Sequence, residues 1–346
     1  MEMRLLGNSG TSVSNYALGT MTFGNESDER ASHAILDDYV RAGGNFVDTA
    51  DVYTTGASEE IIGRWLHSRP TEAADVVLAT KGRFPMGAGA NDLGTSRRHL
   101  RRALDDSLTR LGVDHVDLYQ LHAWDPCTPL EESLRFLNDA ITAGKISYYG
   151  LSNFTGWQLT KAVYLAREHG WALPVTLQPQ YNLLEREIES EIVPAALDAG
   201  LGLLPWSPLA GGWLTGKYDR ETVPAGNTRV GDNPTRQFQG WDLRSHNERT
   251  WRILDELKTV AAAHSATQAQ VALAWLADRP GVTSVILGAR TTEQLADNLG
   301  AAFLVLTDEE KQRLTELSVP QVGNYPYGPD GRNQRDRLLE GGRAGR

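Results

Sequence analysis

Residues 116–150 read VDLYQLHAWDPCTPLEESLRFLNDAITAGKISYYG and contain one strand–helix–strand repeat. Apolar, β-branched runs at 116–121 and 146–150 predict two strands. Apolar residues recur between them at helical spacing: Leu130, Leu134, Leu137 and Ile141. Thr128 and Glu131 around Pro129 predict a capping box at the helix start, and Gly144 predicts its end. A repeat of this kind builds a parallel sheet with its crossover helices.

The same pattern extends along the chain. Strands are predicted at residues 17–20, 45–48, 76–80, 116–121, 146–150, 175–178, 201–206 and 284–287. The starts at 45, 76, 116, 146 and 175 lie 31, 40, 30 and 29 residues apart, which suits one crossover helix each. Helix caps are predicted at Ser96 and, with Gln270, at Thr267. We therefore predict a single α/β domain over residues 1–320, a (β/α)8 TIM barrel.

Three segments lie outside this repeat. Arg4 to Tyr16 predicts an N-terminal β-hairpin, turning at 7–10, that closes the amino-terminal mouth of the barrel. Residues 207–245 are rich in Gly, Pro, Asn and Arg, and a loop of that length inside a compact domain predicts a functional role. After the barrel we expect a helix over 307–317, capped by Thr307 and Glu310, and a partly ordered tail over 321–346.

Composition excludes several classes of protein. Acidic residues outnumber basic ones by 44 to 34, and the net charge of -10 argues against a nucleic-acid partner. The single cysteine, Cys127, forms no intrachain disulfide. The start of the chain lacks a signal-peptide core, and the longest uncharged stretch, 199–216, contains two prolines and five glycines that break a spanning helix. We expect a cytoplasmic protein that has no membrane partner, with an oligomer left open.

Ionisable residues gather where the predicted strands end, which is where barrel enzymes place their chemistry. Asp48 and Tyr53 follow the second strand, Lys81 the third and His122 the fourth. Each alone also has an ordinary structural explanation, such as a helix cap, a loop aromatic, an exposed cation or a satisfied histidine. No H-x-H follows the first strand, which argues against a zinc hydrolase, and no G-x-G-x-x-G follows any strand, which argues against a Rossmann site.

Several motifs resemble the aldo-keto reductase family. They read NFVDTADVY at 45–53, ATK at 79–81, LYQLH at 118–122, GLSNF at 150–154, PWSPL at 205–209, LTGKY at 214–218 and GART at 288–291. They occur in the expected order and extend the resemblance from about Leu5 to about Leu317. The branch that it most resembles is the bacterial one related to potassium-channel β subunits.

The resemblance implies an NADPH-dependent reduction of aldehydes or ketones to alcohols, with Asp48, Tyr53, Lys81 and His122 as the catalytic residues. Independent chemistry agrees, because a carbonyl oxygen that gains negative charge needs a proton donor and positive groups nearby. Tyr53 would donate the proton, Lys81 would stabilise the phenolate, and Asp48 would pair with Lys81. His122 would orient the substrate oxygen.

The resemblance also implies an NADPH/NADP+ site in which the nicotinamide stacks on Trp206 and Arg290 binds the 2′-phosphate. The cofactor-binding residues that it implies are Gly19, Thr20, Met21, Asp48, Ser152, Asn153, Gln178, Trp206, Ser207, Pro208, Leu209, Gly211, Leu214, Lys217, Gly288, Arg290, Gln294 and Asn298. The residues expected to line the pocket for a small-molecule carbonyl substrate are Phe23, Tyr53, Phe84, His122 and Trp124. The alternative is a nucleotide-binding regulatory or redox-sensing module that acts through a partner protein.

Overall fold

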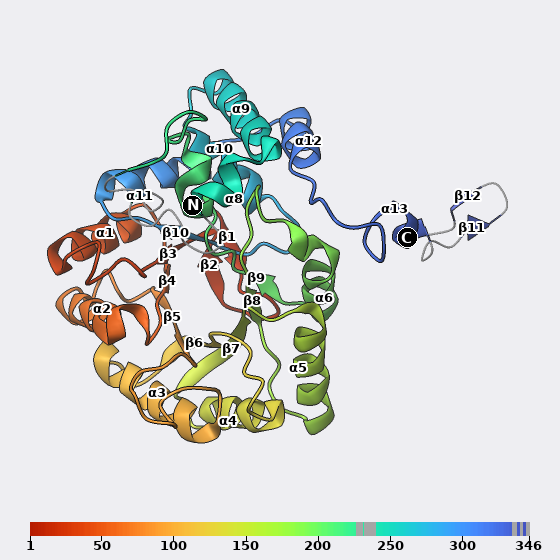
Figure 1. Cartoon of the computed structure of the whole chain (residues 1–346). Helices are drawn as coiled ribbons and strands as arrows, with labels where there is room; N and C mark the ends of the chain where they lie inside the picture. Colours follow the sequence, from red (N-terminus) through yellow and green to blue (C-terminus); the bar gives the residue numbers. More distant parts are fainter. Residues whose placement is uncertain (226–230, 232–239, 334–337, 340–341, 344–346) are drawn as a thin grey trace.

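The chain folds into a barrel of eight parallel strands surrounded by helices (Figure 1). The computed structural model describes residues 1–225, 231, 240–333, 338–339 and 342–343. The strands neighbour one another in the order β10-β3-β4-β5-β6-β7-β8-β9. Their bounds are β3 (Tyr16–Gly19), β4 (Phe46–Asp48), β5 (Val77–Gly82), β6 (Val116–Leu121), β7 (Ile146–Ser152), β8 (Thr176–Gln178), β9 (Gly202–Leu203) and β10 (Val285–Gly288). The predicted strands and their order are confirmed.

Main-chain hydrogen bonds between the segments around β9 and β10 close the ring of strands. The Thr283 amide donates to the Leu203 carbonyl at 2.9 Å, and the Ile286 amide donates to the Pro205 carbonyl at 3.0 Å. An isolated parallel bridge joins Leu203 and Val282. These bonds join the segments around β9 and β10, so the ring of described strands is closed.

Helices follow the strands around the outside of the barrel (Figure 1). The α-helices are α1 (Glu29–Arg41), α2 (Ala57–Ser68), α3 (Arg97–Leu111), α4 (Leu130–Thr142), α5 (Gly156–His169), α6 (Ile192–Ala199), α8 (Trp241–Ser245), α9 (Glu248–Ala263), α10 (Gln268–Ala277), α11 (Thr292–Leu299), α12 (Asp308–Leu317) and α13 (Pro329–Asn333). Short 3-10 turns are η1 (Tyr53–Gly56), η2 (Glu187–Ser190), η3 (Ala210–Thr215) and η5 (Gly300–Phe303).

Most of the predicted helix caps are present. The Ser96 side chain accepts from the His99 amide at the start of α3, and capping boxes open α10 at Thr267 and α12 at Thr307. The predicted capping box at Thr128 is wrong, because Pro129 is the N-cap of α4. The Thr128 hydroxyl donates to the Asp125 carboxylate at 2.7 Å instead, a partner that the helix pattern does not reveal.

The apolar core has two layers. The inner cluster fills the barrel with residues from five of its strands, from segments next to β8 and β9, and from the N-terminal hairpin: Leu6, Val13, Ala17, Phe46, Val77, Ala79, Leu118, Val175, Leu204 and Ile286. The larger outer cluster lies between the strands and the helices, where Leu104, Leu137 and Leu295 are buried. Packing on both faces explains why the strands read as continuous apolar runs.

The N-terminal hairpin closes one end of the barrel, as predicted. Strands β1 (Met3–Leu5) and β2 (Ser12–Ser14) pair antiparallel. Gly7, in the turn between them, has a φ of +55°, and a Cβ built on it would lie 1.8 Å from the Val175 carbonyl oxygen and 2.7 Å from the Gly202 amide nitrogen. The turn therefore packs directly against the amino-terminal ends of β8 and β9.

Two predicted segments are described only in part. In the long loop, residues 226–230 and 232–239 lie outside the described residues, whereas η3 and α8 are defined within it. In the tail, residues 334–337, 340–341 and 344–346 lie outside them, and α13, β11 (Leu338–Leu339) and β12 (Gly342–Arg343) extend away from the barrel (Figure 1). Of the described helices, none is both long enough and apolar enough to cross a membrane.

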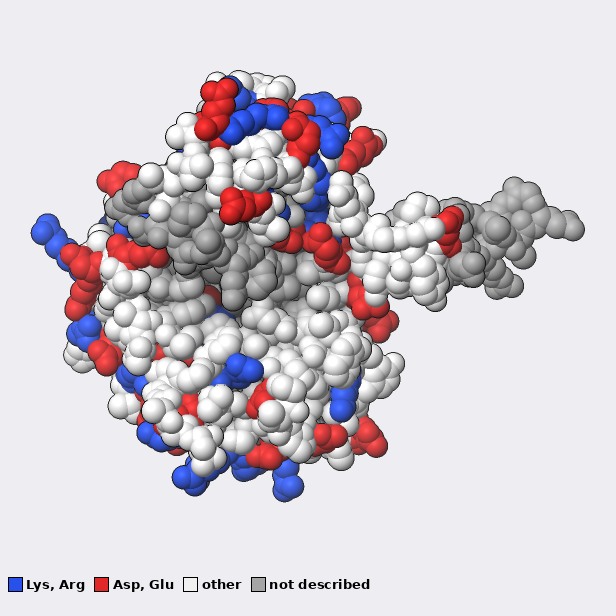
Figure 2. Space-filling model, in the orientation of Figure 1, with Lys and Arg blue, Asp and Glu red and all other residues white. Residues whose placement is uncertain are grey.

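Charges of both signs are interspersed on the face seen in Figure 2, mostly toward its periphery. Among the described residues on this side, the acidic side chains are scattered and form no single patch.

We predict that Gly7→Ala lowers the free energy of unfolding by about 2 kcal/mol or more, because the new methyl group meets main-chain atoms in a left-handed conformation. Gly10→Ala is the matched control in the same turn, since nothing lies within 4 Å of a Cβ built there. Urea unfolding of both variants checks the prediction. Equal stability of the two variants would contradict the close contact of Gly7 with the main chain of Val175 and Gly202.

Candidate active site

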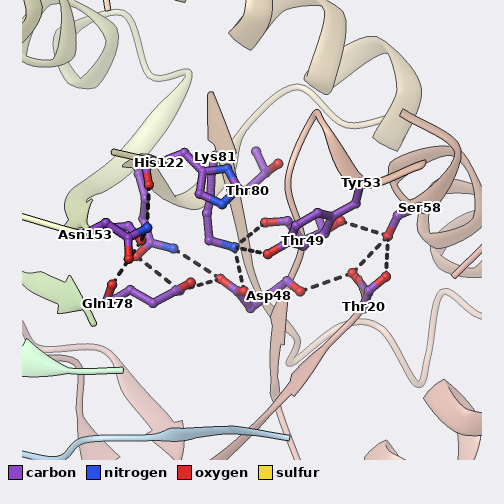
Figure 3. Close-up of polar contacts among 12 residues, drawn as sticks. Thr20, Asp48, Thr49, Tyr53, Ser58, Thr80, Lys81, His122, Asn153 and Gln178 are labelled. Carbon is purple, nitrogen blue, oxygen red and sulfur yellow. Dashed lines mark hydrogen bonds and ion pairs between the residues drawn. The ribbon is translucent and has the colours of Figure 1, made fainter. Parts of the chain in front are cut away.

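A buried lysine holds the centre of the site. Lys81 lies on β5, and its fully buried ammonium group donates three hydrogen bonds (Figure 3). Its acceptors are Asp48 Oδ2 at 2.6 Å, the Thr49 carbonyl at 2.7 Å and Tyr53 Oη at 3.4 Å. All three protons of the ammonium group therefore have a partner, which a buried cation needs.

The carboxylate of Asp48 is equally well held. Asp48 ends β4, and its side chain is only 2% exposed. While Oδ2 accepts from Lys81, Oδ1 accepts from the amide nitrogens of Gln120 at 3.1 Å and Gln178 at 3.0 Å. These charge-assisted hydrogen bonds compensate the carboxylate for its loss of water.

Burial keeps the Tyr53 phenol protonated. Removal from water raises the pKa of the Tyr53 phenol, which the Lys81 ammonium opposes and the Asp48 carboxylate reinforces. Burial alone would lower the pKa of Lys81, but the Asp48 carboxylate and Tyr53 raise it above its ordinary value. The pair is therefore a neutral phenol beside a cationic amine.

His122 faces the same space as a neutral imidazole. Its pKa lies well below the ordinary value because the ring is buried and, in addition, because Lys81 and Arg83 repel a second positive charge. The ring packs edge-on against Phe84 at 4.6 Å and Tyr53 at 5.8 Å between centroids. A neutral imidazole can donate a hydrogen bond to an oxygen without carrying charge.

Hydroxyl groups support the loop that carries Asp48 and Tyr53 (Figure 3). Ser58 Oγ donates to the Thr20 carbonyl at 3.0 Å and lies 3.0 Å from Thr49 Oγ1, while Thr20 Oγ1 donates to the Asp48 carbonyl at 3.1 Å. Thr49 lies in the motif at 45–53 and Ser58 follows that motif, but nothing in their spacing predicts this network.

Strained backbone gathers at the same end of the barrel. Non-glycine residues with positive φ follow the strands there: Thr54, Thr55, Arg83, Asn153, Ser207 and Ala210. Such conformations persist only where the surroundings enforce them, and they cluster at functional sites. The carboxyl-terminal mouth of the barrel is therefore the candidate active site.

A cavity of about 860 Å³ opens at this mouth. Tyr53, His122 and Asp48 line one end of it, whereas Lys81 lies behind them. Every residue predicted to bind the cofactor lines the cavity except Leu214, whose side chain is fully buried. The residues that line the cavity but were not among the predicted site residues are Thr22, Glu26, Gly212, Thr215, Ala269, Ile286, Leu287, Ala289 and Asp297.

The predicted substrate residues divide into two groups. Tyr53 and His122 line the cavity, but Phe23 is fully buried in the outer core and does not. Phe84 reaches the site by packing on His122. Trp124 packs between Phe154 at 5.4 Å and Trp157 at 5.2 Å, so it supports the wall of the site rather than lining the cavity.

A hydrogen-bonded pair fixes the aromatic ring beside the centre. Trp206 Nε1 donates to Asn153 Oδ1 at 3.1 Å, and Asn153 Nδ2 donates to the His122 carbonyl at 2.9 Å. The indole ring is thereby held in one orientation and half exposed in the cavity. Gln178 also lines the cavity, but its amide nitrogen is engaged by Asp48.

The far end of the cavity carries cations. Arg290 lies there beside Glu26, 3.5 Å from Nη1 to Oε2, and Lys217 lines the cavity as well. Gly212 approaches Lys217 so closely that a Cβ would lie 2.4 Å from Nζ. An aromatic platform near the buried centre and cations at the other end fit a nicotinamide dinucleotide, whose phosphates would lie toward Arg290 and Lys217.

A second buried carboxyl group lies behind the site. Asp51 is fully buried, and among the described residues neither of its carboxylate oxygens makes a full hydrogen bond. Burial raises its pKa to about 7, and the Glu59 carboxylate adds to this, although Arg110 and Lys81 oppose it. Glu59, by contrast, accepts from Arg110 Nε at 2.7 Å.

No group of three or more His, Cys, Asp or Glu side chains with metal-binding geometry occurs in the described part of the chain.

Comparison with known proteins gives a consistent result. The model of the aldo/keto reductase family matches residues 16–319. The chain is 39% identical over 307 residues to a probable voltage-gated potassium channel subunit beta of Oryza sativa subsp. japonica, covering 88% of this chain and 92% of the relative.

Two further relatives are named for redox activity. An uncharacterized oxidoreductase, YrpG, of Bacillus subtilis (strain 168) is 38% identical over 334 residues, covering 94% of this chain and 98% of the relative. Versiconal hemiacetal acetate reductase of Aspergillus parasiticus is 33% identical over 345 residues, covering 93% of this chain and 98% of the relative.

We predict that Asp51→Asn flattens the pH dependence of stability. Because the pKa of Asp51 rises from 3.8 to about 7 on folding, the folded protein binds more protons than the unfolded chain between about pH 4 and 7. The contribution of Asp51 to the free energy of unfolding therefore falls as the pH rises from about 4 to 7, by at most about 4 kcal/mol. Asparagine does not ionise, so the variant loses less stability.

Urea unfolding at pH 5 and pH 7.5 measures this change for the wild type and Asp51→Asn. Asp114→Asn, which removes an exposed carboxyl group, is the control and should behave as the wild type. An Asp51→Asn variant with the wild-type pH dependence would contradict the assignment.

Proposed function

Because the chain belongs to the aldo/keto reductase family, we propose that it is an oxidoreductase that reduces aldehydes or ketones to alcohols with NADPH. The observation that carries the proposal is the contact of 3.4 Å between Tyr53 Oη and Lys81 Nζ at the closed end of the cavity. A neutral phenol next to a permanent ammonium group is a suitable acid for an oxygen that gains negative charge.

Tyr53 delivers the proton. When bound, the nicotinamide ring supplies the hydride to the carbonyl carbon. Tyr53 Oη gives its proton to the carbonyl oxygen, and the phenolate that remains is stabilised by the Lys81 ammonium, to which it is already hydrogen bonded. Asp48 prevents Lys81 from moving away, since it holds Nζ at 2.6 Å.

His122 orients the substrate. A cationic imidazole would compete with Tyr53 as the acid, but the buried ring is neutral because its pKa is lowered well below the ordinary value. It therefore acts as a hydrogen-bond donor that directs the carbonyl oxygen toward Tyr53. The two rings are in edge-on contact, and both residues line the cavity.

The choice of NADPH rests on the charges at the far end. Arg290 offers a guanidinium group suited to a phosphate, and the Asn153–Trp206 hydrogen bond holds an aromatic surface for the nicotinamide at the other end. Reduction of a carbonyl to an alcohol and the reverse oxidation use the same groups with the proton moving in opposite directions.

A regulatory role is the second candidate, because the rice relative is named as a probable voltage-gated potassium channel subunit. Initial rates with a panel of small carbonyl compounds and both NADPH and NADH separate the two. Sustained turnover supports the enzyme, whereas a single stoichiometric oxidation of bound cofactor supports a sensor.

We predict that Tyr53→Phe lowers the rate of carbonyl reduction by about 10²–10⁴-fold, because the proton donor is lost. NADPH binding, measured by quenching of tryptophan fluorescence, should remain within about twofold. Tyr164→Phe removes the hydroxyl of an exposed tyrosine on α5 and is the control. Undiminished turnover of Tyr53→Phe would reject the assignment.

We predict that Arg290→Ala weakens NADPH binding about tenfold, since one charge-assisted contact to the 2′-phosphate is lost. NADH binding should change by less than about twofold, because its ribose carries only a hydroxyl group there. Titration of the variant with each cofactor measures both values, and an equal loss for the two would argue against a phosphate contact.

A further inference from the structure

Glu26 and Arg290 form an ion pair between two neighbouring loops at the far end of the cavity. Glu26 lies between β3 and α1, and Arg290 follows β10, the strand that pairs with β3. The guanidinium and carboxylate groups are 3.5 Å apart, with side chains 27% and 28% exposed, and both line the cavity. The pair is therefore open to a ligand.

The two loops are fastened to each other, so the pairing does not depend on the side chains alone. Ser27 Oγ donates to the Arg290 carbonyl at 3.0 Å, and Thr22 Oγ1 donates to the Ala289 carbonyl at 3.0 Å. The Arg290 amide donates to Gln294 Oε1 at 2.9 Å. Main-chain bonds from Ser27 to Thr22 and from Gly24 to Ser27 fold the Glu26 loop into a tight turn. The carboxylate is consequently held next to the guanidinium.

We propose that Glu26 sets the cofactor preference of this chain by competing with the ribose 2′-phosphate for Arg290. The inference rests on the proposed function and deepens it. A phosphate monoester carries nearly two negative charges at neutral pH, so it cannot occupy Arg290 while a carboxylate remains beside the guanidinium without repulsion. When NADPH binds, its 2′-phosphate must either displace the Glu26 carboxylate from Arg290 or bind beside it despite the repulsion.

NADH meets the opposite situation. A ribose 2′-hydroxyl is neutral and can donate a hydrogen bond to a carboxylate, which is how acidic side chains recognise NADH in other nucleotide sites. Arg290 therefore favours NADPH while Glu26 favours NADH. The chain binds both cofactors, and Glu26 keeps the preference for NADPH smaller than Arg290 alone would make it.

A second carboxylate at the same end provides a control. Asp297 lines the cavity, but its oxygens accept from Gln270 Nε2 at 3.1 Å and Thr267 Oγ1 at 3.3 Å, so the side chain is held by α10 and its cap. Asp297→Asn removes one negative charge from this end without touching the Arg290 pair. It separates competition for Arg290 from a general effect of charge.

The test is calorimetric titration of the full chain with NADPH and NADH. Glu26→Gln, which keeps the size of the side chain, should tighten NADPH binding about tenfold and weaken NADH binding about twofold to threefold. Asp297→Asn should leave the NADPH-to-NADH affinity ratio within twofold of the wild type. In an Arg290→Ala background, Glu26→Gln should improve NADPH binding by less than threefold, because there is no guanidinium to compete for.

Fragments of the cofactor show whether the gain in affinity arises at the 2′-phosphate. The same gain should occur with 2′,5′-ADP and be absent with 5′-AMP, which lacks the 2′-phosphate. An unchanged or weaker NADPH affinity in Glu26→Gln overturns the proposal, and so does a gain that is equally large without Arg290. Thermal unfolding of each variant verifies that the fold is intact.

Failure of this inference is distinguishable from failure of the proposed function. If the wild type binds both cofactors and loses turnover in Tyr53→Phe while Glu26→Gln changes nothing, only the role of Glu26 is wrong. If the wild type binds neither cofactor, both the proposed function and the role of Glu26 are wrong.

Discussion

The ion pair between Lys81 and Asp48 is the constraint on which the rest of the site depends. Two charges removed from water are costly unless every polar atom around them is satisfied, and breaking such a pair by removing one partner leaves an uncompensated buried charge. Here the amides of Gln120 and Gln178, from β6 and β8, complete the shell of Asp48, and the Thr49 carbonyl and Tyr53 hydroxyl complete that of Lys81. Five neighbouring strands of the ring, β4 to β8, must therefore lie in register before the pair is stable.

The barrel separates stability from chemistry by using its two ends differently. At the amino-terminal end the hairpin places Leu6 and Val13 in the inner core, and Gly7 touches main-chain atoms of the strands. At the carboxyl-terminal end the inner cluster stops below Asp48 and Lys81, and the backbone adopts positive φ at residues such as Asn153 and Ser207. The well-packed amino-terminal end allows strained backbone to persist at the carboxyl-terminal mouth, because the rest of the fold determines the conformation of the mouth.

The fold was predictable because its signal repeats, whereas contacts between distant segments were not. The first seven apolar runs begin 26 to 40 residues apart, and this repeat predicts a barrel even though 83 residues separate the starts of the last two. Strand β9 is nevertheless shorter than predicted, since Pro205 has no amide hydrogen for the ladder. Asp48 and Asp51 stand three residues apart in one motif, and only the structure separates the satisfied carboxylate from the unsatisfied one. The Glu26–Arg290 pair joins positions 264 residues apart (290 less 26), which no local pattern reveals.

Lys81, which lies behind the cavity, and Arg290, which lines it, suit different tasks because their shapes differ. Lys81 occupies a small enclosed space in which three acceptors converge on one nitrogen, and a compact ammonium satisfies them where a planar guanidinium would not fit. Arg290 stands at a half-exposed edge, where a broad fork can pair with a carboxylate and still present donors to an incoming phosphate. In the proposed function, the end that would perform the chemistry is thus fixed by complete satisfaction of its hydrogen bonds. The end that would select the cofactor is adjustable, because its cation is already paired with a carboxylate that a ligand could replace.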